Sequence, residues 1–281
     1  APVLGRVKSG DAWPFNKSAQ TLSDVAALGS ANNVEMIAEA WDIGYYGDGY
    51  QVGQFPAGWG EWNGRFRDSI RNFVGNGVRG ELNNYINGDY DNFNDQGGPQ
   101  RSVNFVVAHD GYTLADLCSG YNVAGPNYNG SSSSLQWPFG PSDGGDGSVP
   151  GSDFGSSAAD KRQANRNYTA IQMMSRGVPM IVWGDEFCRT QNGNNNPYNV
   201  DSVATWNNYN MINTSSPHLV ATGDTTGGTM AYHNNFGTFG NTENVNGNFK
   251  FMQYMLNLRK NEPALRQDTY NVSYTFKKEN G

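Results

Sequence analysis

Asn104-Phe-Val-Val-Ala-His-Asp110 is the stretch that decides the fold class, because a short apolar run ends there in polar residues. Two other stretches, Val34-Glu-Met-Ile-Ala-Glu-Ala-Trp41 and Val178-Pro-Met-Ile-Val-Trp-Gly-Asp-Glu186, have the same design. Short apolar runs that do not alternate with polar residues are typical of parallel strands covered by helices on both faces. We therefore expect three buried parallel strands, each with acidic residues near its C-terminal end.

The segments between these strands have the apolar spacing of helices. This spacing is found in residues 18–28, 66–74, 157–176 and 249–260. The alternation of helices and strands predicts an α/β fold. In α/β enzymes the chemistry lies at the C-terminal ends of the parallel strands. The acidic residues of the three strands are therefore the first candidates for a functional site.

The composition limits the classes of partner. Lys and Arg total 19 against 26 Asp and Glu, and this net charge of −7 argues against nucleic acid, whose phosphates need a basic face. No apolar run approaches the roughly 20 residues that span a membrane. Only 16% of the residues are charged, so polarity comes mainly from Asn, Ser, Thr, Gln and Tyr. Such a surface suits neutral, hydroxyl-rich ligands and is common in exported proteins, so we expect an extracellular protein.

The two cysteines, Cys118 and Cys188, leave two interpretations open. They form one disulfide, as in many exported proteins, or they are two small buried hydrophobic residues. The spacing of the His and carboxylate residues does not predict a metal centre, and we expect no metal or other cofactor in this chain.

Two carboxylates at strand ends, Glu39 and Asp110, are the candidate catalytic residues. Hydrolysis of a glycosidic bond uses two carboxyl groups that flank the bond, and His109 precedes the second of them. The alternative is that both carboxylates accept hydrogen bonds from backbone amides and that the tryptophans are core residues. Five tryptophans offer flat faces on which sugar rings can stack: Trp41, Trp59, Trp62, Trp137 and Trp183.

Three motifs resemble those of one enzyme family. Glu35-Met-Ile-Ala-Glu-Ala-Trp-Asp42 resembles the strand-five motif of the α-amylase superfamily, whose Glu is the acid/base, and this matches Glu39. Residues 104–114 resemble the strand-seven motif, whose His-Asp pair grips sugar hydroxyls and corresponds to His109 and Asp110. Residues 177–186 are similar to the strand-eight motif, and the three motifs occur in the family's order.

Longer stretches resemble the isoamylase and glycogen-debranching group of this superfamily, namely residues 50–68, 137–145, 189–201 and 258–266. The resemblance implies the second half, strands 5–8, of a (β/α)8 TIM barrel in residues 1–266, followed by the start of a C-terminal β-sandwich domain in residues 267–281. It also implies hydrolysis, with retention, of α-1,6-glucosidic branch linkages in amylopectin or glycogen. The family's usual calcium loops lie upstream of this chain, which leaves calcium open.

The resemblance also concerns the start of the chain. Residues 1–6 resemble the segment that follows the strand-four motif, in which the family carries its nucleophilic Asp. We therefore expect the nucleophile about two residues before Ala1, and we expect the remainder of the same polypeptide upstream as a partner. The chain as given then lacks the group that forms the covalent glycosyl-enzyme.

The resemblance extends to further substrate-binding residues. Trp41 and Asp42 are expected to line the site, and Trp62 and Asn63 fall where the family shapes the end of the sixth strand. Arg189 reaches the substrate or pairs with Asp185. For several of these residues a structural role is the alternative: Trp41 and His109 in the core, and Asp185 and Glu186 as acceptors for loop amides.

Two other functions stay open at this stage. The same barrel supports an α-1,4-acting hydrolase or a transglycosylase, and products from amylopectin and amylose distinguish these from a debranching enzyme. The third option is a non-catalytic glucan-binding fragment, which an upstream sequence without an Asp in a strand-four context would favour.

Overall fold

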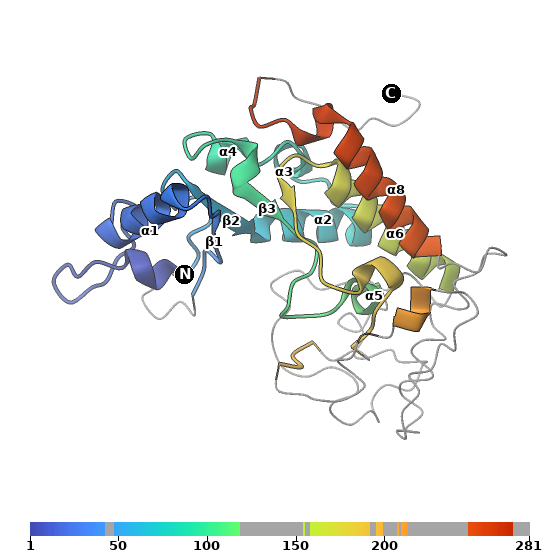
Figure 1. The fold of residues 1–281 in the computed structure, drawn as a ribbon. Coiled ribbons are helices and arrows are strands. Elements are labelled where there is room, and N and C mark those ends of the chain that lie inside the picture. Colours follow the sequence, from blue (N-terminus) through green and yellow to red (C-terminus); the bar gives the residue numbers. More distant parts are fainter. Residues whose placement is uncertain are drawn as a thin grey trace.

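The computed structural model describes residues 1–42, 48–118, 154, 158–191, 195–198, 207, 209–212 and 247–271. Its centre is a parallel sheet of four described strands in the order β1-β2-β3-β4 (Figure 1). The strands are β1 (Met36–Ala38), β2 (Trp59–Asn63), β3 (Ser102–Asn104) and β4 (Val178–Pro179). Parallel neighbours that follow one another in the chain need crossover connections, and the predicted α/β class is confirmed.

The helices lie between and beside these strands. The longer ones are α1 (Gln20–Ala31), α2 (Gly64–Asn76), α6 (Ala158–Met174) and α8 (Gly247–Asn261), and each matches one of the four predicted helical segments. Helices α6 and α8 pack side by side (Figure 1). Three short α-helices are α3 (Leu82–Ile86), α4 (Tyr90–Phe93) and α5 (Leu114–Leu117). Within the described residues, 3-10 helices cover Pro2–Gly5, Pro99–Arg101, Asp185–Phe187, Tyr209–Ile212 and Pro263–Arg266.

Local chemistry explains where α2 begins and ends. The Asn63 side chain accepts a hydrogen bond from the Phe66 amide at 3.0 Å, which satisfies one of the free N–H groups of the first turn. At the other end, Gly77 has a φ of 69°, the left-handed conformation that ends many helices and that glycine adopts at little cost. The helix therefore starts directly at the end of β2 and keeps that strand end in a fixed position.

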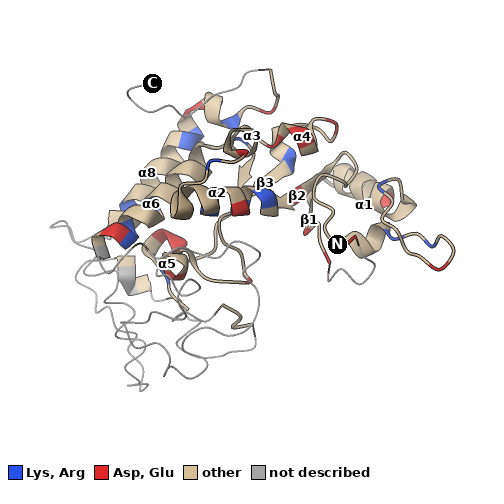
Figure 2. Ribbon diagram, turned by 180° about the vertical axis from the view of Figure 1, so that it is seen from behind, with Lys and Arg blue, Asp and Glu red and all other residues tan. Residues whose placement is uncertain are grey.

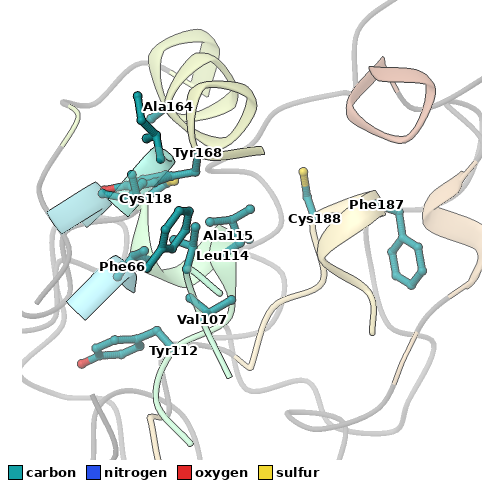
Figure 3. Close-up of a cluster of buried hydrophobic side chains, with 14 of the residues drawn as sticks. Phe66, Val107, Tyr112, Leu114, Ala115, Cys118, Ala164, Tyr168, Phe187 and Cys188 are labelled. Atoms are coloured by element: carbon teal, nitrogen blue, oxygen red, sulfur yellow. The ribbon is translucent and has the colours of Figure 1, made fainter. Parts of the chain in front are cut away.

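The largest hydrophobic cluster lies between α2, α6 and the segment after β3 (Figure 3). Phe66, Leu114 and Tyr168 are buried in it, together with both cysteines. Cys118 and Cys188 are free thiols, so the second of the two predicted alternatives holds. A smaller cluster packs α1 against β1 and β2, and a third joins α6 to α8.

The strands differ in number, length and burial from the three strands predicted from the apolar runs. Strand β2 is the one that the apolar runs did not predict. Its sequence is Trp-Gly-Glu-Trp-Asn, which contains no apolar run. Strand β3 ends at Asn104, and Phe105 to Val107 continue as buried chain outside the strand. Burial on both faces is found for β3 but not for β1 or β4, since Ile37 is 51% and Val178 43% exposed. These strands are the two edges of the described sheet, and one face there is open to solvent.

Several expectations lie mostly outside the described residues. The proposed C-terminal β domain, residues 267–281, is described only to residue 271. Trp137 lies outside the described part as well.

Among the described helices, none combines the length and apolarity of a membrane span. Lys and Arg are scattered over several elements of the ribbon rather than gathered on one of them (Figure 2).

Candidate active site

A line of aromatic rings joins the ends of the first three strands. The ring centroids of Trp41, after β1, and Trp62, in β2, are 6.3 Å apart. Trp62 in turn lies 5.5 Å from the imidazole of His109, which follows β3. Phe105 completes the group, at 6.4 Å from Trp41 and 6.1 Å from Trp62. The parallel register thus brings together three residues that the sequence predicted for the site.

His109 and Asp110 form an exposed pair next to these rings. Their side chains are 62% and 53% exposed, with Nε2 of His109 3.5 Å from Oδ2 of Asp110. The alternative of a core histidine is therefore wrong. Both groups can form hydrogen bonds with a ligand, because solvent reaches them.

Glu39 is half-buried, two residues before Trp41. The first residue of the chain lies near it, in agreement with the position of the N-terminus beside β1 in Figure 1. Burial lowers the pKa of the Ala1 amino group, while the negative charges of Glu39 and Asp42 act in the opposite direction. Residues at the very start of the chain are therefore close to the candidate acid.

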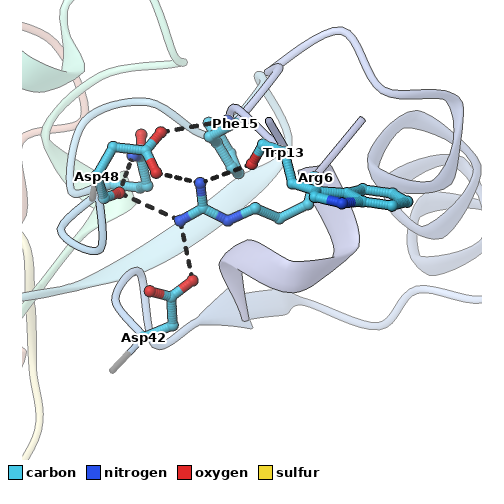
Figure 4. A network of polar contacts seen from close by, with 6 residues as sticks. Arg6, Trp13, Phe15, Asp42 and Asp48 are labelled. Atoms are coloured by element: carbon cyan, nitrogen blue, oxygen red, sulfur yellow. Dashed lines mark hydrogen bonds and ion pairs between the residues drawn. The ribbon is translucent and has the colours of Figure 1, made fainter. Parts of the chain in front are cut away.

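Asp42 is held by Arg6, whose side chain is only 3% exposed (Figure 4). The guanidinium Nη2 lies 3.0 Å from Oδ2 of Asp42, and Nη1 pairs with Asp48. Nη1 also donates to the Trp13 carbonyl at 3.1 Å. The hydrogen bond from Arg6 lowers the pKa of Asp48. One cation thus fixes both ends of the segment that follows β1.

A recess of about 300 Å³ lies between the segments after β3 and β4. It contains two residues predicted for the site, His109 and Arg189. Arg189 donates to Oε1 of Gln191 at 3.1 Å, and burial lowers the pKa of its guanidinium although Asp185 and Asp116 attract it. The described residues that line it are His109, Val182, Trp183, Arg189, Gln191, Pro197, Tyr198 and Asn207.

Two carboxylates that follow β4 accept hydrogen bonds from backbone amides. Asp185 accepts from the Leu114 amide at 3.0 Å and from the Val182 amide at 3.3 Å, and burial raises its pKa to about 7. Glu186 accepts from the Gly184 amide at 2.8 Å. The alternative that this acidic pair bonds to loop amides is confirmed.

Asn63 does not join the other predicted site residues. Its side chain is fully buried, donates to Asp89 at 2.8 Å and to the Ser102 hydroxyl at 2.9 Å, and caps α2. This is a correction of the predicted substrate contact, because the amide points into the molecule rather than to the strand ends. Trp59 is a core residue too, since only 4% of it is exposed and its indole donates to the Leu22 carbonyl.

The sequence analysis missed three residues that shape the site. Arg6 and Tyr198 occur in stretches that resemble the family, but nothing in a linear sequence pairs Arg6 with Asp42. Asp116 is fully buried and accepts from the Thr190 hydroxyl at 2.6 Å and from the Gln191 amide at 2.9 Å. In the part of the chain that the structure describes, no group of three or more His, Cys, Asp or Glu side chains is arranged to hold a metal ion.

Comparison with curated proteins finds clear sequence relatives, although no protein-family model matches the chain. An isoamylase of Flavobacterium sp. is 45% identical over 198 residues, which cover 68% of this chain and 24% of the isoamylase. A glycogen operon protein GlgX homolog of Haemophilus influenzae is 39% identical over 223 residues, 73% of this chain and 31% of the relative. The chain thus spans about a quarter to a third of these relatives.

Solved structures with a similar fold include two bacterial pullulanases. The enzyme of Bacillus acidopullulyticus superposes with a TM-score of 0.55 at 18% identity, over 89% of this chain and 25% of the pullulanase. The Paenibacillus barengoltzii pullulanase, in complex with maltohexaose and alpha-cyclodextrin, gives a TM-score of 0.56 at 18% identity, over 90% and 33% of the two chains. At this identity the likeness shows the fold alone, an α/β fold of the TIM-barrel type.

Proposed function

Over about two thirds of its length the chain belongs to the isoamylase and debranching group of the α-amylase family, and from this premise we propose that it contributes the general acid of a branch-hydrolysing enzyme. The proposed reaction is hydrolysis of α-1,6-glucosidic linkages in amylopectin or glycogen with retention. The whole protein, including an Asp upstream of Ala1, would carry it out. In the proposed barrel, β1 to β4 are strands five to eight.

One observation carries the proposal. The rings of Trp41, Trp62 and His109 lie within 6.3 Å of their neighbours, at the C-terminal ends of adjacent parallel strands. Glu39 and Asp110 are sequence neighbours of the two outer rings, which supports a common sugar pocket for both carboxyl groups. Aromatic rings beside two carboxyl groups fit the apolar faces and the glycosidic oxygen of a glucan.

The proposed mechanism has two steps. In the first, Glu39 donates its proton to the glycosidic oxygen while the upstream Asp attacks the anomeric carbon, so that the bond to the leaving chain breaks and a glycosyl-enzyme forms. In the second, Glu39 takes a proton from water, and the water oxygen replaces the Asp at the anomeric carbon. The position of Ala1 close to Glu39 supports an upstream nucleophile beside this acid.

The remaining site residues bind the sugar in this proposal. Asp110 and His109 are exposed and accept or donate hydrogen bonds to the hydroxyls of the distorted ring, which should strengthen in the transition state. Trp41 and Trp62 provide apolar faces for the ring. Arg189 contributes a cationic donor from the neighbouring recess.

Glu39→Gln in the full-length protein tests the proposal. Amide substitution removes the transferable proton, so the release of linear chains from amylopectin should fall by about two to four powers of ten. Glu35→Gln is the matched control, since Glu35 is 82% exposed and pairs with Arg101 rather than facing the aromatic line. Near-normal turnover of the Glu39 variant would overturn the proposal, and cleavage of amylose would favour an α-1,4-acting enzyme or a transglycosylase.

We also propose that the protein acts outside the cell. The low share of charged residues, 16%, and the many neutral polar residues support this. Activity recovered only from the cell interior, with none in the culture medium, would contradict it.

A further inference from the structure

Two aromatic side chains in the recess beside His109 are unusually exposed. Tyr198 is 82% and Trp183 68% exposed, and these are the two highest values among the large hydrophobic residues of the described chain. Both line the recess that also contains His109 and Arg189. A ligand in this recess can contact both rings and gains free energy by covering their apolar faces.

Three hydrogen bonds stabilise the turn that carries Trp183. The amides on either side of it, Val182 and Gly184, donate to the carboxylates of Asp185 and Glu186. The Arg189 amide donates to the Gly184 carbonyl at 2.8 Å. Gly184 has a φ of 103°, and a Cβ there would lie 2.5 Å from Arg189 and Asn207, so the turn requires glycine. Trp183 is thus presented on a rigid support.

The segment before Tyr198 is tied to the chain that follows His109. The Gly111 amide donates to the Asn195 carbonyl at 3.0 Å, and the Gln191 side chain donates to the Gly111 carbonyl at 3.1 Å. The backbone amide of Gln191 donates to the buried carboxylate of Asp116. These bonds keep the two sides of the recess together without a ligand, so little ordering is needed when one binds.

The polar groups of the recess suit a neutral polyol. Arg189 adds a donor to the lining, and Asn207 adds an amide side chain. A glucose unit has apolar C–H faces for aromatic rings and hydroxyls at its rim for such groups, whereas a purely apolar ligand would make no hydrogen bond to them.

We propose that Trp183 and Tyr198 form an aromatic subsite that binds a glucose unit of the α-glucan chain beside His109. The subsite rests on the proposed function for its choice of ligand, and it goes beyond it by assigning chain-length preference to two residues outside the acid–base machinery. Maltooligosaccharides long enough to reach the recess gain affinity from it, and shorter ones do not.

Binding measurements on the full-length Glu39→Gln protein test the subsite without hydrolysis. Calorimetric titrations with maltose through maltohexaose should show a gain in affinity at a defined chain length. Trp183→Ala should weaken binding of the longer oligosaccharides about tenfold, the loss of one stacked ring, and leave the shorter ones unchanged. Tyr198→Ala should act in the same direction, and Trp183→Phe should keep most of the affinity.

Tyr254→Ala is the matched control, because Tyr254 is 63% exposed on α8, outside the recess. Equal affinities for all lengths in the Glu39→Gln protein, both with and without Trp183→Ala, would overturn the subsite, as would no binding of any maltooligosaccharide. Hydrolysis of amylopectin by the unmutated protein is measured separately. Length-dependent binding without branch hydrolysis would reject the proposed function and keep the subsite.

Discussion

Two pairs of carboxylates lie in or after the strands of this sheet, and they differ in what surrounds them. Glu61 in β2 and Asp185 after β4 are buried, and each uses both oxygens to accept backbone amides. Glu39 is half-buried, and Asp110 is 53% exposed beside His109. The two pairs share residue type and strand context, yet only the second pair can reach a ligand.

The comparison shows that a raised pKa does not identify the catalytic acid here. Burial raises the pKa of Glu61 and of Asp185 to about 7 in each case, the range expected of a general acid near neutral pH. Both groups, however, have a structural role. Glu61 accepts hydrogen bonds from the Gly53 and Phe55 amides, and Asp185 accepts from the Leu114 and Val182 amides. Backbone donors indicate the structural role of Glu61 and Asp185, whereas the proposed chemistry of Glu39 and Asp110 rests on their accessibility and aromatic neighbours.

Asp110→Asn should separate the pairs most strongly. Loss of the charge should reduce kcat/KM for amylopectin at least a hundredfold, because the transition state gains positive charge that the carboxylate stabilises. The free energy of unfolding should change by less than about 0.5 kcal/mol, since the side chain is half exposed. Chemical denaturation alongside steady-state kinetics provides both numbers, and a large loss of stability would place Asp110 with the structural pair.

Asp185→Ala should show the reverse pattern. Two buried amides lose their acceptor, which should cost about 3 kcal/mol of unfolding free energy. Asp185→Asn keeps one acceptor oxygen and should cost less. Urea titrations of the three proteins measure this order, and equal stability of wild type and the Ala variant would remove the basis for calling Asp185 structural.

The contrast between buried and accessible carboxylates also explains which parts of the fold and the site could be predicted from the sequence. Short apolar runs contain β1 and β4 and begin at the last residue of β3, and the strand-end rule led to Glu39, His109 and Asp110. The apolar runs did not include β2 because Glu61 and Asn63 are polar, and their burial is compensated by partners outside the strand, the Gly53 amide and Asp89. Such partners depend on tertiary structure, which local patterns do not contain.

Glu61→Gln should change how stability depends on pH. The folded-state pKa of Glu61, about 7, lies above the ordinary value of 4.5, so the folded state binds more protons than the unfolded state between these values. The associated stability is complete below about pH 4.5 and is lost as pH rises through 7. Between pH 5 and 8 the wild type should lose about 2 kcal/mol that the Gln variant does not lose. Parallel pH profiles of unfolding free energy would contradict the assignment of this proton to Glu61.

Arg6→Gln should have the smallest effect. It tests whether a buried ion pair contributes both to stability and to the position of the proposed substrate-binding residues. Arg6 is buried like the structural carboxylates, but it holds Asp42 beside the exposed site. Breaking the pair should cost about 1 kcal/mol of stability and raise KM a few-fold, because the segment after Trp41 loses its anchor while Glu39 keeps its proton. Lys17→Gln breaks an exposed pair with Asp95 and should change neither quantity. If Arg6→Gln lowered kcat with KM unchanged, Arg6 would act on the chemical step itself. The distinction between structural and catalytic residues would then not hold for the residues around β1.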